Sequence, residues 1–313
     1  MVTDRQKYDL PRSMKDQMAC YSTNGVFSLP MYTKYDRDAI QRATRGQSDN
    51  ELWSKYRYGC IGASNVGSVL RFMRYRGNRR RANPWSLAGR IIGNERSLKH
   101  LPQVARGYEM EPVARAKYAE YQRMKGHQDV DVKECGMFFH PRKSFLEASP
   151  DGLVRCSCCG GGLVEIKCPS TAPTEKPSPR NEKFLRRDNG GKFHLKRNHP
   201  YYDQIQAQLA VTGRSWCDFF VYKDSGVFLE RIERDPQWQR SFLMDMDRFF
   251  WRFIVPVLVS RAIKNNQGAV HQPYGCPYCG EPSHRVPFCW YWFPLRCRNC
   301  KQLGHKAKVC PNS

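Results

Sequence analysis

The sequence reads ASPDGLV at residues 148–154 and LVEIKCP at residues 163–169, and these two stretches predict a pair of β-strands. Proline and glycine on either side of Asp151 favour a turn that presents this carboxylate. Because side chains alternate along a strand, Glu165 and Lys167 face the same way, and the aliphatic residues beside them face the other. Two carboxylates beside a lysine suit Mg²⁺ and a phosphodiester, since hard oxygen ligands hold an ion that polarises phosphate.

The lysine of this set has two roles open to it, because an ammonium can orient an attacking water or stabilise charge that develops in the transition state. The alternative is an exposed strand on which Glu165 and Lys167 form an ordinary salt bridge. Other motifs in the chain are needed to distinguish a hydrolytic metal site from an exposed strand with a salt bridge.

The composition indicates a polyanionic partner. The 313 residues carry a formal net charge of +23, which favours nucleic acid first and an anionic membrane surface second. No run of about 18 apolar residues occurs, so we expect no transmembrane helix. Residues 1–7 show no apolar core of a signal peptide, and the 14 cysteines cluster as metal ligands do in a reducing compartment. We therefore expect an intracellular protein without a membrane partner.

Residues 57–64 contain an arginine and a serine just before a predicted helix. Ser64 predicts the N-cap of a helix whose apolar stripe follows at helical spacing. That stripe consists of Val66, Val69, Leu70 and Met73. An N-cap explains the serine by itself, but a helix N-terminus, a hydroxyl and the Arg57 guanidinium also suit an anion.

Six arginines in eleven residues begin at the end of that helix, with no acid among them. They are Arg71, Arg74, Arg76, Arg79, Arg80 and Arg81. Such a run is typical of a solvated face, and equally of a DNA-backbone contact or a nuclear-import patch. The sequence leaves these alternatives open.

Residues 105–125 predict a helix that ends at Gly126. Pro112 is tolerated in a first turn, so we expect the regular helix to begin near Glu111. A glutamate at a helix start needs no function, because the helix dipole favours an acid there.

The other predicted elements surround these motifs. Residues 1–50 are expected to form a loosely structured lead-in or a short helical cap, and residues 170–198 a long basic loop. Further elements are predicted as strands at 136–139, 144–147 and 217–222, a helix at 200–212 bounded by Pro200 and Gly213, and an aromatic-rich helix at 238–258.

Three cysteines, Cys156, Cys158 and Cys159, precede a run of glycines between the two strands quoted first. They are either half of a zinc site or free thiols in a glycine-rich turn. We favour free thiols, because no fourth ligand lies nearby in the sequence.

The C-terminal tail carries a repeated spacing of cysteine and histidine. Cys276, Cys279, His284 and Cys289 are followed, 21 residues on, by Cys297, Cys300, His305 and Cys310. Three thiolates and one imidazole make a closed tetrahedral Zn²⁺ site, and so short a segment needs the metal to fold. The tail therefore predicts two Zn²⁺ ions. The motif resembles the zinc knuckles of proteins that bind single-stranded nucleic acid, and a purely structural or protein-binding module is the alternative.

The two strands quoted first resemble the lambda-exonuclease family, also called YqaJ viral recombinases, a branch of the PD-(D/E)xK nucleases. The pattern is S-P-D-G-[LV] followed by [LV]-E-[IL]-K-C-P. The resemblance extends to R-x-x-x-[IV]-x-A-S ending at Ser64, G-x-x-x-E-x-x-A around Glu111 and Y-x-x-Q-[IV]-Q starting at Tyr201. These motifs keep the family's order from about residue 50 to about residue 260.

The resemblance implies a role for each matching residue. Asp151 and Glu165 would bind Mg²⁺ or Mn²⁺, and Lys167 would serve the attacking water. Glu111 would be the third carboxylate, with Glu109 in its place if the helix has another register. The resemblance also implies a 5′-phosphate pocket made of Arg57, Ser64 and Ser149, and an active-site edge made of Tyr201 and Gln204.

We accordingly expect an α/β fold with a PD-(D/E)xK core, a mixed sheet flanked by helices, followed by a small zinc-knuckle tail. The expected parts are a lead-in at 1–50, a nuclease domain at 51–263, a linker at 264–273 and tandem knuckles at 274–313.

By resemblance the chain is a 5′-to-3′ exonuclease on double-stranded DNA ends in recombination or repair, in the nucleus. The expected partners are duplex ends and single-stranded DNA. RNA, a single-strand annealing protein and a homo-oligomer remain open, as do a non-catalytic nucleic-acid-binding protein and an endonuclease or RNase on the same core.

Overall fold

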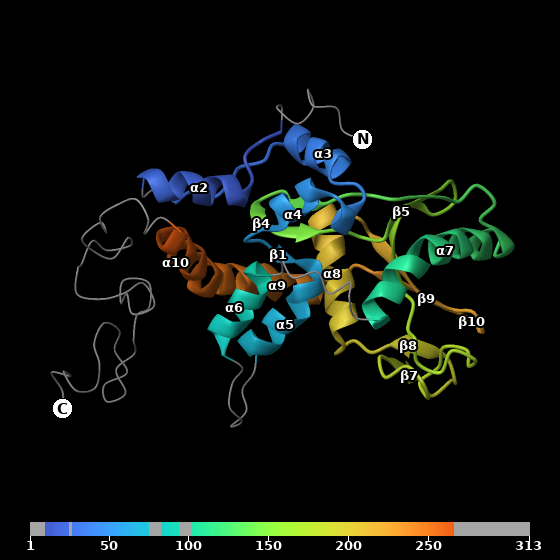
Figure 1. The fold of residues 1–313 in the computed structure, drawn as a ribbon. Helices are drawn as coiled ribbons and strands as arrows, with labels where there is room; N and C mark the ends of the chain where they lie inside the picture. The colour runs from blue at the N-terminus through green and yellow to red at the C-terminus, as the bar shows by residue number, and fades with distance from the viewer. Residues whose placement is uncertain (1–9, 25–26, 75–82, 94–101, 266–313) are drawn as a thin grey trace, which may run out of the picture.

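The computed structural model describes residues 10–24, 27–74, 83–93 and 102–265. Within them it confirms an α/β fold of mixed sheets flanked by helices (Figure 1). The predicted zinc ligands and residues 266–273 of the predicted linker lie outside the described residues. So do Arg76, Arg79, Arg80 and Arg81 of the arginine run.

A five-stranded sheet carries the two strands that decide the fold. Its order is β10 (Gly226–Glu233), β9 (Trp216–Lys223), β6 (Gly160–Lys167), β5 (Gly152–Cys156) and β2 (Asp131–Lys133). β5 and β6 form the predicted antiparallel hairpin, whereas β6 and β9 are parallel. A parallel pair needs a long crossover, and here it contains α8 (Pro200–Thr212).

Two helices cover opposite faces of this sheet, and the alternation along β6 fits them. Val164 belongs to the same hydrophobic cluster as Tyr118 of α7 (Pro102–Met124). Leu163 belongs to a different hydrophobic cluster, which includes Leu209 of α8. Figure 1 shows α7 and α8 on either side of the strands. Since period-two alternation sends neighbouring residues to opposite faces, Glu165 shares the α8 face with Leu163.

The start of α7 corrects the sequence analysis. The helix begins at Pro102, nine residues before Glu111, and Pro112 lies inside it. An internal proline removes one backbone hydrogen bond and normally disfavours a helix, which is why a later start was expected. Burial of Ala114 and Tyr118, both 0% exposed, offsets that cost by anchoring the following turns on the sheet.

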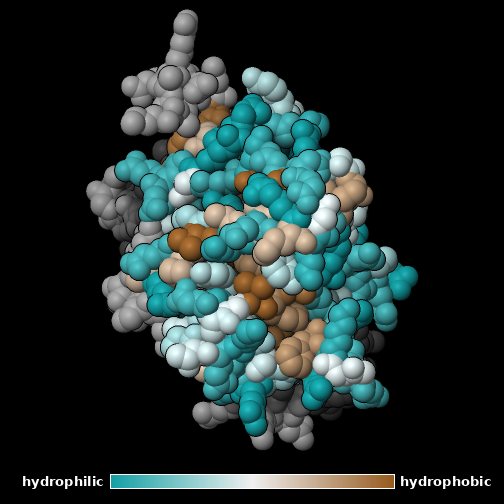
Figure 2. Space-filling view, turned by 90° about the vertical axis from the view of Figure 1, so that its right-hand side faces the viewer, coloured by the Kyte–Doolittle hydropathy of each residue, from teal (hydrophilic) through white to brown (hydrophobic). Residues whose placement is uncertain are grey.

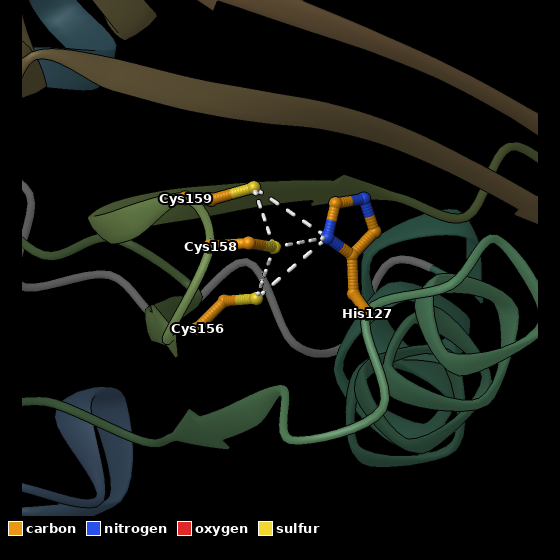
Figure 3. Close-up of side chains that lie close together, drawn as sticks. All are labelled: His127, Cys156, Cys158 and Cys159. Carbon is orange, nitrogen blue, oxygen red and sulfur yellow. Dashed lines mark hydrogen bonds between the residues drawn. The ribbon is translucent and has the colours of Figure 1, made fainter.

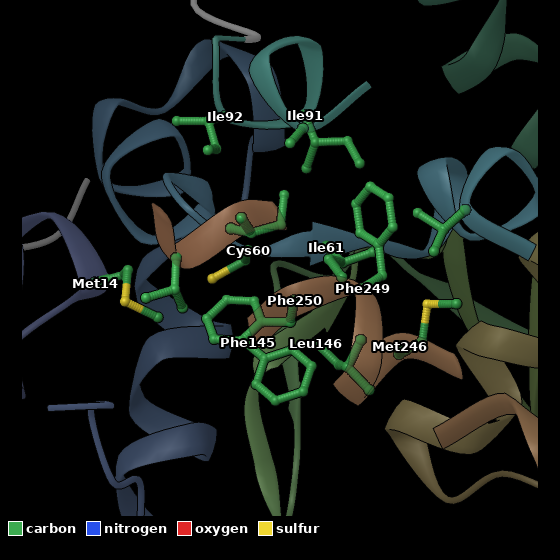
Figure 4. Close-up of a cluster of buried hydrophobic side chains, with 14 of the residues drawn as sticks. Met14, Cys60, Ile61, Ile91, Ile92, Phe145, Leu146, Met246, Phe249 and Phe250 are labelled. Carbon is green, nitrogen blue, oxygen red and sulfur yellow. The ribbon is translucent and has the colours of Figure 1, made fainter. Parts of the chain in front are cut away.

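The N-terminal residues are helical rather than loose. α2 (Met14–Asn24) and α3 (Lys34–Ala43) are followed by α4 (Glu51–Arg57), so the helical cap is the alternative that holds for the described part of the lead-in. Met14 and Ile40 are fully buried in the largest hydrophobic cluster, shown in part in Figure 4. The lead-in therefore packs into the same core as the later elements.

That cluster surrounds a second sheet of order β1 (Ile61–Gly62), β4 (Lys143–Ala148) and β3 (Phe138–His140). α5 (Ala63–Arg74), α6 (Pro84–Ile92) and the C-terminal helices pack against it. The latter form one continuous helical path, α9 (Pro236–Phe249), the π-turn η3 (Phe250–Ile254) and α10 (Val255–Asn265). Phe250 stacks on Phe145 with ring centroids 4.1 Å apart, so the aromatic side chains of the predicted helix at 238–258 contribute to this core.

The basic segment 170–198 is not a simple loop. It contains the hairpin of β7 (Leu185–Arg187) and β8 (Phe193–Leu195), because Phe184, Leu185 and Leu195 are buried against the α8 face of the large sheet.

The surface is largely hydrophilic. On the face shown in Figure 2, hydrophobic residues form small patches among a majority of hydrophilic ones. A search of the described helices finds none with the length and hydropathy that a bilayer crossing requires.

Candidate active site

Asp151 lies beside the carboxyl end of β6, immediately before β5. The β5–β6 register pairs Gly152 with Val164, and Asp151 Oδ2 accepts a 2.6 Å hydrogen bond from the backbone N–H of Ile166. A hydrogen bond from Gln47 Nε2 to the Pro150 carbonyl, 3.0 Å long, stabilises the turn. The predicted turn therefore fixes the position of the carboxylate against the neighbouring strand.

Glu165 is 1% exposed and faces α8. Its Oε1 accepts a 2.6 Å hydrogen bond from Gln204 Nε2, and its Oε2 accepts a 2.6 Å hydrogen bond from Gln208 Nε2. The two glutamines are one turn apart on the same face of α8. Gln204 was predicted at the site edge. Gln208 was not, although its spacing of four residues from Gln204 was a usable signal.

Lys167 pairs with Glu165, as expected of neighbours on one strand face, and its Nζ lies 4.8 Å from the centre of the Tyr201 ring. Burial disfavours the charged ammonium, but the carboxylates of Glu165 and Asp151 outweigh it and raise the pKa of Lys167. The lysine thus remains a cation, held between an acid and an aromatic face.

Glu111 reaches the site from α7, and Glu109 does not. Glu111 forms an ion pair with Arg115, whose Nε donates to the Asp151 carbonyl at 2.8 Å. Glu109 is exposed on another side of the helix. The sequence analysis missed Arg115, although a position four residues after an acid is a common place for its partner.

Some of these side chains border a cavity of about 490 Å³. Glu111, Asp151, Lys167 and Tyr201 line it, together with the segment 168–171 that follows β6. Glu165 lies behind them. The structure thus brings together six of the predicted residues, Glu111, Asp151, Glu165, Lys167, Tyr201 and Gln204, from α7, the β5–β6 hairpin and α8.

The electrostatics of this cavity favour a cation. Burial, followed by the negative charges of Glu165 and Glu111, raises the pKa of Asp151 well above its ordinary value. Burial also raises the pKa of Glu111, against the opposing charge of Arg115. Like charges held this close destabilise each other until a positive charge joins them. Three carboxylates with oxygen donors only are a donor set that fits Mg²⁺ or Mn²⁺.

The residues predicted to bind phosphate are linked through Trp53. Arg57 NH2 donates to Ser64 Oγ at 3.3 Å, and the guanidinium lies 4.5 Å from the centre of the Trp53 ring. Trp53 Nε1 donates to Ser149 Oγ at 2.9 Å. One expectation is wrong: α5 begins at Ala63, so Ser64 lies in its first turn and is not the N-cap.

Glu147 is an unpredicted member of this group. It is 1% exposed, its Oε1 lies 3.8 Å from Arg57 Nη1, and that oxygen has no hydrogen-bond partner among the residues that the structure describes. Burial raises the pKa of Glu147, with Arg57 acting against the shift. A side chain on Gly62, which pairs with Glu147 across β1 and β4, would collide with the carboxylate. Gly62, which directly precedes Ala63 and Ser64 of the R-x-x-x-[IV]-x-A-S motif, therefore leaves space for the buried Glu147 carboxylate.

Comparisons with solved structures find an alkaline exonuclease from Laribacter hongkongensis, with 28% identity and a TM-score of 0.46 over 70% of this chain and 98% of that one. A second is the Shutoff and Exonuclease Protein of Kaposi's sarcoma-associated herpesvirus, with 11% identity and a TM-score of 0.47 over 73% and 74% of the two chains. No curated protein sequence matches this chain.

The family comparison covers the part of the chain in which the site lies. A sequence model described as YqaJ-like viral recombinase domain matches residues 52–215. That range includes the β5–β6 hairpin, Glu111 on α7 and the glutamines of α8. The match spans more than half of the 313 residues, and the chain belongs to the YqaJ-like viral recombinase domain family.

Proposed function

We propose that this protein is a metal-dependent deoxyribonuclease that removes nucleotides from double-stranded DNA ends in the 5′-to-3′ direction. The observation that carries the proposal is the convergence of Glu111, Asp151 and Lys167 on one cavity, with Glu165 behind them. Membership of the YqaJ-like family supports the same chemistry.

Glu111, Asp151 and Glu165 would hold Mg²⁺ or Mn²⁺. The bound ion would supply Lewis-acid polarisation of the phosphodiester and activation of a water. Lys167, whose ammonium stays charged, would orient the water or stabilise charge on the phosphate as it develops. Gln204 and Gln208 would fix the orientation of the Glu165 carboxylate.

The phosphate-binding group lies a short distance from the reacting centre. Ser149 precedes Asp151 by two residues, which an extended chain spans in about 7 Å. A terminal 5′-phosphate bound by Arg57, Ser64 and Ser149 would thus place the neighbouring phosphodiesters near the carboxylates. This separation suits an enzyme that works from an end.

The tail is proposed to hold two Zn²⁺ ions and to bind the single strand that digestion exposes. The net charge of +23 supports nucleic acid as the partner of the whole chain. Duplex ends and single-stranded DNA are the partners that the proposal requires.

The proposal is tested by digestion of linear duplex DNA with 5′-phosphate or 5′-hydroxyl ends, in Mg²⁺ or in EDTA. We expect digestion only with the metal, a preference for phosphorylated ends, and no activity in Lys167→Ala. Lys143→Ala is a matched control, because Lys143 forms an ion pair with Asp247 at 2.8 Å, away from the cavity. It should digest like the wild type.

Two further substrates separate the alternatives. A closed circular duplex should remain intact, and its cleavage would indicate an endonuclease. Faster degradation of RNA than of DNA would indicate an RNase. If no nucleic acid is degraded with any divalent ion, the chain is a binding protein and the hydrolytic proposal is wrong.

A further inference from the structure

A second cluster of ligand-type side chains lies at the far end of the β5–β6 hairpin. Cys156 is the last residue of β5, and Cys158 and Cys159 form the turn before β6. His127, in the loop between α7 and β2, points into the same space (Figure 3). The four ligand atoms all lie within 4.8 Å of one another. The fourth ligand that sequence proximity did not supply thus comes from 29 residues before Cys156.

The separations within the cluster are close to those of tetrahedral coordination, with the contacts of Cys158 to Cys156 and to His127 the shortest. His127 Nδ1 lies 3.1, 3.5 and 3.6 Å from the sulfurs of Cys158, Cys159 and Cys156. The sulfur of Cys158 lies 3.1 Å from that of Cys156 and 3.6 Å from that of Cys159. Zn–S bonds of about 2.3 Å and a Zn–N bond of about 2.0 Å in a tetrahedron place sulfurs about 3.8 Å apart and nitrogen about 3.6 Å from each sulfur.

Hydrogen bonding does not account for the convergence. Three thiols approach the same Nδ1 atom, which has a single position for a proton or a lone pair. A disulfide does not account for it either, since the described cysteines are free and a bonded pair of sulfurs is about 2.05 Å apart. One soft cation shared by all four atoms satisfies every ligand at once.

The surroundings hold the cysteine turn in place. Asp129 Oδ2 accepts from the Ser157 N–H at 2.9 Å, and Trp216 Nε1 donates to the Cys159 carbonyl at 3.1 Å. Gly160 has φ +72°, which lets the chain reverse directly after the cysteines. Any side chain at Gly162 would collide with the Trp216 ring. The glycines that seemed to mark an ordinary turn instead shape a fixed loop around the thiols.

An arginine and the end of α7 also contact the ligand residues. Three thiolates and Zn²⁺ carry a net charge of −1, and the Arg231 guanidinium contacts the Cys159 thiol while it pairs with Asp218. The backbone N–H of His127 donates to the Gln122 carbonyl of α7 at 3.0 Å, which fixes the position of His127 relative to the end of the helix. Such outer partners are typical of built metal sites.

We propose that His127, Cys156, Cys158 and Cys159 bind a structural Zn²⁺ ion that ties the C-terminal end of α7 to the β5–β6 hairpin. With four protein ligands the site is closed, so it has no position for a substrate. The ion joins the helix and the hairpin that also carry Glu111, Asp151 and Glu165. That last connection rests on the proposed function, whereas the zinc site itself does not.

The test is zinc content per full-length chain, measured by mass spectrometry of the metal after gel filtration. His127→Gln keeps a hydrogen-bonding side chain but offers no imidazole, and it should lose one Zn²⁺ relative to the wild type. His127→Cys replaces the ligand with a thiolate and should retain that ion. Cys20→Ser changes a half-buried cysteine outside the cluster and should leave the count unchanged.

The double variant Cys276→Ser with Cys297→Ser removes ligands of both predicted knuckle ions, so its remaining zinc reports on the hairpin site. Adding His127→Gln to this variant should remove one further Zn²⁺. Loading with Co²⁺ gives a second readout, since His127→Cys should strengthen the thiolate-to-metal absorption and His127→Gln should weaken it. Equal zinc content in wild type and His127→Gln, or a disulfide among the three cysteines, would overturn the proposal. Neither readout uses nuclease activity, so a failure of the proposed function would leave this test intact.

Discussion

The two ends of the β5–β6 hairpin present opposite kinds of ligand. At one end Asp151 and Glu165 offer carboxylate oxygens, and at the other Cys156 begins a turn of thiols. Cys156 lies five positions after Asp151, or about 17 Å along the strand. α7 serves both ends, because it carries Glu111 to the first and leads directly to His127 at the second.

The difference between the ends explains why we propose a different metal for each. Oxygen donors around an open cavity suit a hard ion that must also accept substrate. Four soft ligands around a closed centre suit an ion that stays. The carboxylates at the first end repel one another. At the second end the proposed Zn²⁺ would bind all four ligand atoms. We therefore expect the first end to govern activity and the second to govern stability.

The largest effect should follow from removal of a carboxylate at the first end. Asp151→Asn keeps an oxygen that can accept from the Ile166 N–H but removes the charge that would hold the ion. We expect a loss of about 10³-fold in single-turnover digestion of linear DNA, equal to about 4 kcal/mol of barrier. Activity within threefold of the wild type would show that Asp151 is no ligand.

The next effect distinguishes two neighbouring acids of α7, Glu111 and Glu109. Glu111→Gln should slow digestion by about 10²-fold, because the third carboxylate is lost while the helix remains. Glu109→Gln is the matched control, two residues away on the exposed side, and its rate should be unchanged. The reverse ranking in rate assays at several Mg²⁺ concentrations would mean that the helix register has been misassigned.

A smaller effect is expected from the buried glutamine that supports Glu165. Gln208→Ala removes the 2.6 Å hydrogen bond to Glu165 Oε2 without touching the cavity. Outer partners of metal ligands typically contribute a factor of 10 to 100. We expect about a tenfold rise in the Mg²⁺ concentration needed for half-maximal rate. A change in rate at saturating metal, with no change in that concentration, would assign Gln208 another role.

The smallest effect concerns the loss of folding stability at low pH. Acid also releases bound metal ions, so the metal-free protein is compared. Burial, with nearby Arg142 and Lys143, lowers the pKa of His140 to about 4. The unfolded chain binds this proton from about pH 6.5, so stability is lost as the pH falls from 6.5 towards 4. His140→Asn should flatten the melting temperature over this window. An unchanged pH profile would mean that His140 is not neutral in the folded state.

The sequence predicted those parts that short motifs encode. Glu165 and Lys167 were assigned to one face by alternation along a single strand, Asp151 was assigned to the turn between Pro150 and Gly152, and α8 was bounded correctly by Pro200 and Gly213. Other features depend on contacts between distant segments. Pro112 argued for a late helix start, but packing of the later turns on the sheet overrode its local cost.

The residues that were missed have the same physical explanation. His127 lies 29 residues from Cys156, and only the antiparallel pairing of β2 with β5 brings its loop to the thiols. Glu147 is a polar group whose burial cannot be read from local composition, whereas Gln208 could have been found from its spacing of four residues from Gln204. The β7–β8 hairpin consists of three-residue strands in a basic segment, too short for a periodic signal.

The central claim, that carboxylates from α7 and the β5–β6 hairpin hold a divalent ion, is tested most directly by Mn²⁺ binding. Zinc-loaded full-length protein is titrated with Mn²⁺, and free Mn²⁺ is followed by electron paramagnetic resonance. We predict that wild type and Glu109→Gln bind Mn²⁺ alike and that Asp151→Asn binds it at least tenfold more weakly. Equal Mn²⁺ binding by wild type and Asp151→Asn would contradict the account.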